Sequence, residues 1–216
     1  LVPADSEGLD RRPVGRLDGE PAFAELFFDQ CRVHESNLLG AEGQGWNVAM
    51  ATTSSERGLN LRAPGRFLAA ADRLADLYRE LVGDGSTDPD LVDEVVRAWA
   101  GARAYRWHTY ATAARLASGG DLGSASSMMK VFWSELDVEL HATALRLLGD
   151  RAELVAGAPA AVDGGSWMSG YLFALSGPIY AGTNEIQRNI IAERVLGLPR
   201  EIDLERGLSW SETRRS

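Results

Sequence analysis

The sequence predicts a mainly α-helical chain in which a bundle of antiparallel helices follows a short β-rich segment. Long stretches with helical periodicity are separated by short stretches rich in Gly and Pro. The first 40 residues are instead rich in strand formers and turn signals. Of the 216 residues, 45% are apolar, which is enough to bury a sizeable core. Long helices joined by short loops are typical of a bundle.

The β-rich segment, residues 1–40, contains one clear strand and one clear turn. ELFFDQCRV at 25–33 is dominated by strand-forming residues, and LDGE at 17–20 carries a turn signal before it. A Gly-punctuated connection then leads to the helical part of the chain.

Three long helices are predicted next. The first covers about 45–82 and is bent near Pro64, because proline disrupts the helical hydrogen-bond ladder. Asp88 and Pro89 begin the second, which reaches about Ser118 before Gly119 and Gly120. The other predicted segments are a third helix at 122–148, a Gly/Ala/Pro-rich connection at 149–165 and a short helix at 166–176.

The last helix has both ends marked in PIYAGTNEIQRNIIAERVLGLP, residues 178–199. Gly182 permits a tight turn, and Thr183 occupies the N-cap position. Apolar residues then recur at helical spacing, at Ile186, Ile190, Ile191 and Leu196. Stop signals follow at Gly197 and Pro199, so the pattern predicts an amphipathic helix. A plain capped helix explains this pattern. Free N–H groups beside a hydroxyl would also suit a carbonyl oxygen or a flavin ribityl or phosphate group.

Charge and composition exclude several functional classes. The net charge is −9 and Lys130 is the only lysine, which argues against a nucleic-acid surface. No apolar run suggests a membrane span. Cys31 is the only cysteine, so a reducing, cytoplasmic location is expected. No metal site is predicted, because the three histidines lack partners at ligand spacing; they are His34, His108 and His141.

Two segments resemble the acyl-CoA dehydrogenase family. IYAGTNEIQRNIIAERVLG is similar to its C-terminal signature, and CRVHESNLLGAEGQGWNVAM at 31–50 resembles its crossing from the middle β-domain into the C-terminal helical domain. The resemblance implies a four-helix bundle domain at 41–216, preceded by the tail of the β-domain at 1–40. Because the chain begins as if within a strand, it is expected to be part of a longer polypeptide. The implied activity is FAD-dependent oxidation of an acyl-CoA to its 2-enoyl form, with electron-transfer flavoprotein or a similar acceptor.

This reaction needs a carboxylate base, and the usual position in the signature holds Ala181, which has no proton-accepting group. Some members, including those resembling isovaleryl-CoA dehydrogenase, carry the base on the first long helix, where this sequence has Glu56. A solvated glutamate paired with an arginine is the alternative. Arg57 is a candidate substrate contact, although an ion pair that orients the helix is the simpler explanation.

The resemblance also assigns roles around the signature. The backbone N–H of Ala181 would donate to the thioester carbonyl, and Tyr180 would line the acyl pocket or simply be a core tyrosine. Thr183 and Glu185 occupy positions that the family uses to bind FAD.

Two further flavin elements of the family are degraded. Arg-x-x-Phe-Gly is reduced to Arg79, and Gln-x-x-Gly-Gly is reduced to Gly149. Both act on the neighbouring subunit's FAD, so the pattern resembles the heteromeric acyl-CoA dehydrogenases of actinobacteria, which act on steroid side-chain thioesters. The chain is then either a catalytic subunit, in a hetero-oligomer or with copies of itself, or a catalytically silent structural subunit.

Overall fold

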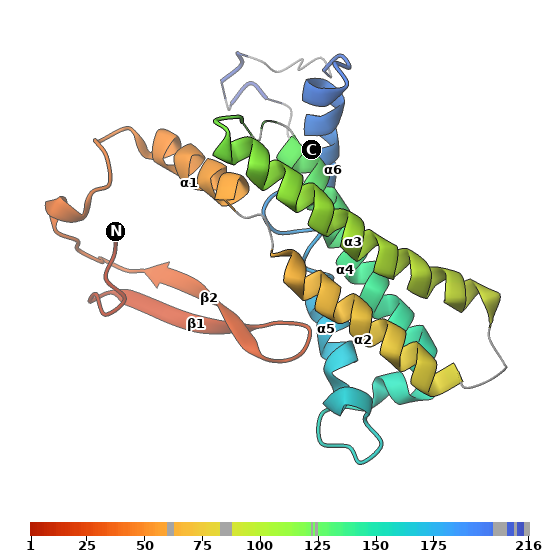
Figure 1. Ribbon diagram of the computed structural model, residues 1–216. Helices are drawn as coiled ribbons and strands as arrows, with labels where there is room; N and C mark the ends of the chain where they lie inside the picture. Colours follow the sequence, from red (N-terminus) through yellow and green to blue (C-terminus); the bar gives the residue numbers. More distant parts are fainter. Residues whose placement is uncertain are drawn as a thin grey trace.

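The structure, a computed structural model, places a β-hairpin beside a group of helices (Figure 1). This confirms the predicted fold class. The residues described are 1–59, 63–82, 88–121, 123, 125–200, 207–209 and 211–213, without the side chains of 53–59, 82 and 125.

The hairpin consists of antiparallel strands β1 (Leu9–Gly15) and β2 (Pro21–Phe28). The predicted turn joins them, and Gly19 N donates to Arg16 O at 2.9 Å. The predicted strand at 25–33 is wrong in its second half. β2 ends at Phe28, the amide of Asp29 donates to Gly8 O at 2.8 Å, and Gln30 adopts a φ of 50°, which takes the chain out of the sheet.

The segment predicted as one bent helix forms two helices, α1 (Gly45–Leu59) and α2 (Pro64–Val82). Pro64 is the first residue of α2, a position where its missing N–H has no cost, so it begins a helix instead of bending one. Residues 60–62 lie outside the described part of the chain. In Figure 1 α1 lies apart from the bundle that α2 enters.

The other helices follow the predicted order: α3 (Pro89–Ala117), α4 (Ala125–Leu148), α5 (Ser166–Ala174) and α6 (Asn184–Ile190). Short 3₁₀ helices at Gly149–Glu153 and Val162–Gly165 lie within the predicted connection between α4 and α5. Asp88 caps α3, as predicted, by accepting from Asp90 N at 3.0 Å. At the other end, Gly119 has a φ of +83°.

The core lies between α2, α3, α4 and α5. Its largest fully buried side chains include Phe67, Tyr105, Leu140 and Trp167, and the rings of Phe67 and Tyr105 meet edge to face at 5.1 Å. Helices α3 and α4 approach closely at Gly101, where an added Cβ would lie 2.9 Å from a methyl carbon of Leu136.

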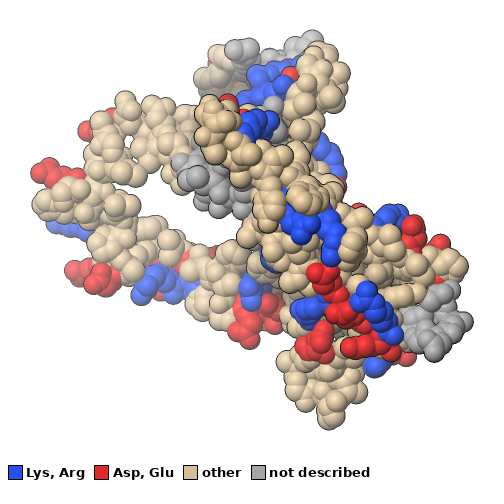
Figure 2. Space-filling model, viewed as in Figure 1, with Lys and Arg blue, Asp and Glu red and all other residues tan. Residues whose placement is uncertain are grey.

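The outer surface carries charges of both signs. Acidic and basic side chains are intermixed over α2 and α3 on the face that Figure 2 shows. Ion pairs such as Asp72–Arg103, at 2.8 Å, join these two helices. None of the described helices is both long and apolar enough to cross a bilayer.

We expect Leu140→Ala to lower the free energy of unfolding of the complete protein by about 2–5 kcal/mol, because its side chain is 0% exposed and truncation leaves a cavity. Leu198→Ala, at an exposed leucine, is the control and should cost about 0.5 kcal/mol or less. Urea unfolding measures both. Equal losses would contradict the placement of Leu140 at the centre of the core.

Candidate functional site

The candidate site is built on residues 178–182, here called the signature loop, which connects α5 to α6. Ala181 and Gly182 adopt consecutive positive φ angles of 55° and 83°. An added Cβ on Gly182 would lie 2.5 Å from Nε2 of Gln187, so only glycine fits without displacing that side chain. The predicted tight turn at Gly182 is therefore confirmed, and its close neighbour is an amide of the same chain.

Helix α6 begins as predicted but buries a different face. Thr183 is the N-cap, and its hydroxyl accepts from Ile186 N at 3.3 Å. The buried residues are polar: Asn184 and Gln187 are each 2% exposed, whereas Ile186 is 49% exposed. The amphipathic interpretation is therefore wrong at Ile186, whereas Ile190 and Ile191 are half-buried; the fully buried face of α6 is polar and holds the loop through hydrogen bonds.

The same helix changes its hydrogen-bond period near its end. Ile191–Val195 is a π-helical turn in which Leu196 N donates to Ile191 O at 3.0 Å. The five-residue interval between Ile191 and Leu196 matches this wider turn. Leu196 itself is 66% exposed, so its apolar side chain does not belong to the core.

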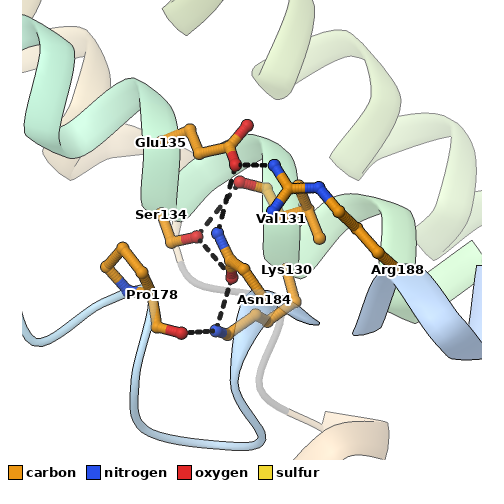
Figure 3. A network of polar contacts seen from close by, with 7 residues as sticks. All are labelled: Lys130, Val131, Ser134, Glu135, Pro178, Asn184 and Arg188. Atoms are coloured by element: carbon orange, nitrogen blue, oxygen red, sulfur yellow. Dashed lines mark hydrogen bonds and ion pairs between the residues drawn. The ribbon is translucent and has the colours of Figure 1, made fainter. Parts of the chain in front are cut away.

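A buried amide at Asn184 lies at the centre of a polar network (Figure 3). Its Oδ1 accepts from Lys130 Nζ at 2.7 Å and from Ser134 Oγ at 3.1 Å, both on α4. Its Nδ2 donates to Glu135 Oε1 at 3.3 Å, and the same carboxylate oxygen pairs with Arg188. These contacts fix the orientation of the amide and join α4 to the start of α6.

Lys130 also reaches the signature loop directly. Its residue is 8% exposed, and its ammonium group donates to Pro178 O at 3.1 Å. Burial lowers the pKa of Lys130 below its ordinary value of 10.5, while the carboxylates of Glu185 and Glu135 act in the opposite direction. Between the folded-state pKa and the unfolded value, the unfolded chain binds more protons, so the contribution of this group to stability rises with pH there.

Glu185 lies exposed in the first turn of α6. Hydrogen bonds from its own backbone N–H and from the Thr183 hydroxyl lower the pKa of its carboxyl group. Its contribution to stability is therefore present above the ordinary pKa of 4.5 and is lost as the pH falls through the lower folded-state value. The carboxylate can accept hydrogen bonds from hydroxyl groups of a ligand.

Tyr180 lies at a cavity of about 460 Å³ between the hairpin turn and α5. Apolar side chains line most of it, including those of Leu17, Phe23, Phe173 and Ile179. Tyr180 also packs beside Trp133, with ring centroids 6.0 Å apart. The structure therefore places this tyrosine both at the edge of the core and at an apolar cavity.

The other predicted site residues lie elsewhere or cannot be placed. Glu56 and Arg57 belong to α1, but their side chains lie outside the described part of the structure. Arg79, in the last turn of α2, is exposed and pairs with Asp76 at 2.5 Å. Gly149 follows α4 with a φ of 54°. In Figure 1 the ends of α2 and α4 lie at the opposite end of the bundle from α6.

Sequence reasoning missed the residues that hold the loop. A lone lysine in the apolar run MMKVFW was the only signal for Lys130. Nothing local distinguished the others, because their partners lie about 50 residues away; they are Ser134, Glu135 and Asn184. Among the described residues, no cluster of His, Cys, Asp or Glu is arranged to hold a metal ion.

Comparison with known proteins gives consistent matches. The profile described as "Acyl-CoA dehydrogenase, C-terminal domain" matches residues 43–196. Acyl-CoA dehydrogenase IpdE1 of Mycobacterium tuberculosis is 39% identical over 206 residues, which are 93% of this chain and 50% of that protein. IpdE1 of Mycolicibacterium smegmatis is 36% identical over 206 residues, 94% of this chain and 49% of the relative. The chain thus spans about half the length of these relatives.

Solved structures agree on the fold. The ChsE4-ChsE5 complex from Mycobacterium tuberculosis contains a chain that matches with a TM-score of 0.79 and 26% identity, over 93% of this chain and 52% of that one. The Tcur3481-Tcur3483 steroid ACAD matches with a TM-score of 0.80 and 23% identity, over 93% of this chain and 51% of its own, and so supports the fold alone.

We expect Gly182→Ala to destabilise the complete protein more than Gly119→Ala does. Both glycines have a φ of +83°, but only at Gly182 does a Cβ collide with the amide of Gln187. Gly119→Ala should cost about 1 kcal/mol from backbone strain. Gly182→Ala should cost at least about 1 kcal/mol more, because the Gln187 hydrogen bonds to the loop are displaced. Chemical unfolding of the two variants tests this difference, and equal costs would contradict the close approach.

Proposed function

The chain belongs to the acyl-CoA dehydrogenase family, and from this premise we propose that it is a catalytic subunit of an FAD-dependent enzyme that dehydrogenates an acyl-CoA thioester between its α and β carbons. The observation that supports a catalytic role is the hydrogen bonding of the signature loop. The loop carbonyls of Pro178, Ala181 and Gly182 accept hydrogen bonds from inside the protein, whereas the amide N–H of Ala181 donates to no other described residue.

This arrangement suits a donor to the thioester carbonyl. Pro178 O accepts from Asn184 N at 2.9 Å and from Lys130, and Gln187 Nε2 donates to Ala181 O and Gly182 O at 3.2 and 3.4 Å. A loop held this way needs little rearrangement to present the Ala181 N–H to a ligand. Such a donor stabilises the negative charge that develops on the carbonyl oxygen as the α-proton leaves.

Glu56 is the proposed base that removes the α-proton. Ala181 cannot serve, and the family resemblance of the sequence around α1 assigns the base to Glu56. A carboxylate poised beside a bound thioester and shielded from water would have a raised pKa, which suits a group that takes and later releases a proton. Arg57, the next residue, is proposed to contact the substrate or to orient the helix.

Thr183 and Glu185 fit the hydroxyl-bearing parts of FAD. Both lie at the start of α6, and they offer a hydroxyl and an exposed carboxylate. Neither is a cation, so the pyrophosphate needs positive charge from elsewhere. When bound, the flavin accepts the hydride from the β-carbon. Arg79 belongs to the last turn of α2 and Gly149 directly follows α4, and these helix ends lie at the other end of the bundle (Figure 1), where the two residues would serve a neighbouring subunit's flavin site.

The cavity at Tyr180 supports a bulky acyl group as substrate. Its volume of about 460 Å³ is within the usual range for small-molecule sites, and its lining is mostly apolar. The family resemblance of the sequence implies steroid side-chain thioesters. We therefore place a steroid-like acyl thioester first among substrates. Electron-transfer flavoprotein or a similar acceptor is the proposed oxidant of the reduced flavin.

A homologous subunit is the proposed partner. The ChsE4-ChsE5 structure is a complex of differently named chains, and one of them shares this fold. A partner that keeps the Arg-x-x-Phe-Gly and Gln-x-x-Gly-Gly elements would complete the flavin site of this chain. Assembly with copies of itself would require other residues to take over these contacts.

The alternative is a catalytically silent subunit that stabilises the assembly or completes its partner's site. One observation favours it: the guanidinium group of Arg79, which remains from the first degraded element, is paired with Asp76 of the same helix. A paired, exposed arginine contributes less to a neighbour's pyrophosphate than a free one would.

Replacement of Glu56 separates the two hypotheses. In the assembled protein, Glu56→Gln should lower dehydrogenase turnover by about 10² to 10⁴ fold, because the amide cannot accept the α-proton. Glu42→Gln, at an exposed glutamate just before α1, is the matched control and should leave turnover unchanged. Unchanged turnover in Glu56→Gln would contradict the proposed base and favour the silent subunit.

The need for a partner has its own test. We expect a flavin absorbance spectrum only when the complete protein is co-expressed with a homologous subunit, because the flavin elements that act between subunits are degraded here. Protein purified alone is the comparison. Flavin bound by the protein alone would contradict the heteromeric proposal, and a complex without flavin would contradict the catalytic one.

A further inference from the structure

We propose that Lys130 is a positioning residue for the reaction: its buried ammonium group fixes the signature loop so that the Ala181 N–H points at the thioester carbonyl. This inference rests on the proposed function and adds to it a residue from α4, about 50 positions away from the loop in the sequence. Lys130 itself contacts neither substrate nor cofactor in this proposal.

The ammonium group of Lys130 makes its contacts at both ends of the signature loop. It bonds to the residue that opens the loop, through Pro178 O at 3.1 Å, and to the residue that opens α6, through Asn184 Oδ1 at 2.7 Å. These two residues are themselves joined, because Asn184 N donates to Pro178 O at 2.9 Å. The ammonium group of Lys130 therefore links the first residue of the loop, Pro178, to the first residue of α6, Asn184 (Figure 3).

The signature loop contains backbone strain. Ala181 has a φ of 55°, a conformation that costs a non-glycine residue about 1–2 kcal/mol. Such a conformation persists only where the surrounding structure over-determines it. Gln187, on α6, donates to the carbonyls of Ala181 and Gly182, whereas Lys130, on α4, donates to the carbonyl of Pro178. Gln187 and Lys130 donate to different carbonyls, so neither side chain can replace the other.

A lysine at position 130 supplies more than a neutral hydrogen-bond donor would. Ser134 Oγ lies 3.1 Å from the same oxygen of Asn184, but its single proton is shared with Val131 O at 3.0 Å, so this neutral donor does not hold the amide alone. A buried cation adds bonds that are about twice as strong as neutral ones. The carboxylates of Glu135 and Glu185 lie near enough to favour the charged form. The chain therefore places a lysine here although burial lowers its pKa, and its donor contacts with both ends of the loop give that placement a purpose.

The test uses the complete protein in its assembled form and compares Lys130→Met with the unmodified protein. Methionine has similar length and no donor. Amide hydrogen exchange in peptides that cover 178–186 should become about 10-fold faster or more, the change expected for a lost hydrogen bond to a charged group. Turnover should fall by a similar factor through kcat, while KM for the acyl-CoA changes less than about twofold.

Two further variants complete the design. Thr143→Val is the matched control: Thr143 is also buried on α4, but it bonds to Glu94 at 3.3 Å, and we expect normal loop exchange and kcat. If Lys130→Met fails to fold, Ser134→Ala decides, because it removes the other donor to Asn184. It should raise exchange over 178–186 by less than about 10-fold, and unchanged exchange would contradict the idea that the donors to Asn184 on α4 hold the loop.

The outcomes separate this inference from the proposed function. Unchanged exchange at 178–186 overturns the role of Lys130 whatever the activity. Faster exchange with unchanged kcat overturns positioning for catalysis. An unmodified assembly that lacks dehydrogenase activity overturns the proposed function instead, while the exchange measurement still decides whether Lys130 holds the loop.

Discussion

The site depends on one costly interaction, the burial of the Lys130 ammonium group between α4 and the start of α6. An unpaired charge in such a place would be strongly destabilising. Here two oxygens accept hydrogen bonds from the ammonium group, and two nearby carboxylates favour its charged form. Because its partners are a loop carbonyl and a helix-opening amide, the position of the loop, the start of α6 and the packing of that helix on α4 are coupled.

This coupling explains why α6 has a polar inner face. A helix held by apolar packing would bury its isoleucines, as the sequence pattern suggested. Instead Asn184 and Gln187 point inward and satisfy loop carbonyls and the α4 network. Buried polar groups must find partners, so this face tolerates little change of register. Apolar contacts alone would hold the helix less specifically.

Features encoded locally could be predicted from the sequence, whereas long-range contacts could not. Asp88 and Thr183 were identified as caps because a cap depends only on the next three residues. The resemblance to the family signature located the loop through its amino-acid sequence. Three features depend on residues that are distant in the sequence or on local preferences that compete with each other. They are the end of β2, the separation of α1 from α2 and the partners of Lys130. At Pro64 the same residue can bend one helix or begin another, and the sequence alone does not distinguish these outcomes.

Ala181 occupies the position where related sequences carry the base. Its presence there is physically connected with the hydrogen bonds that hold the loop. A loop that carries the base must let a carboxylate side chain reach the α-carbon, which limits how tightly the loop can be held. With alanine at this position, the proposed role of the loop rests on its backbone alone. In that proposal, each carbonyl that Lys130 and Gln187 bind helps to orient the Ala181 N–H without hindering a side chain. If the base lies on α1, proton removal and charge stabilisation come from separate elements, so each can be positioned independently.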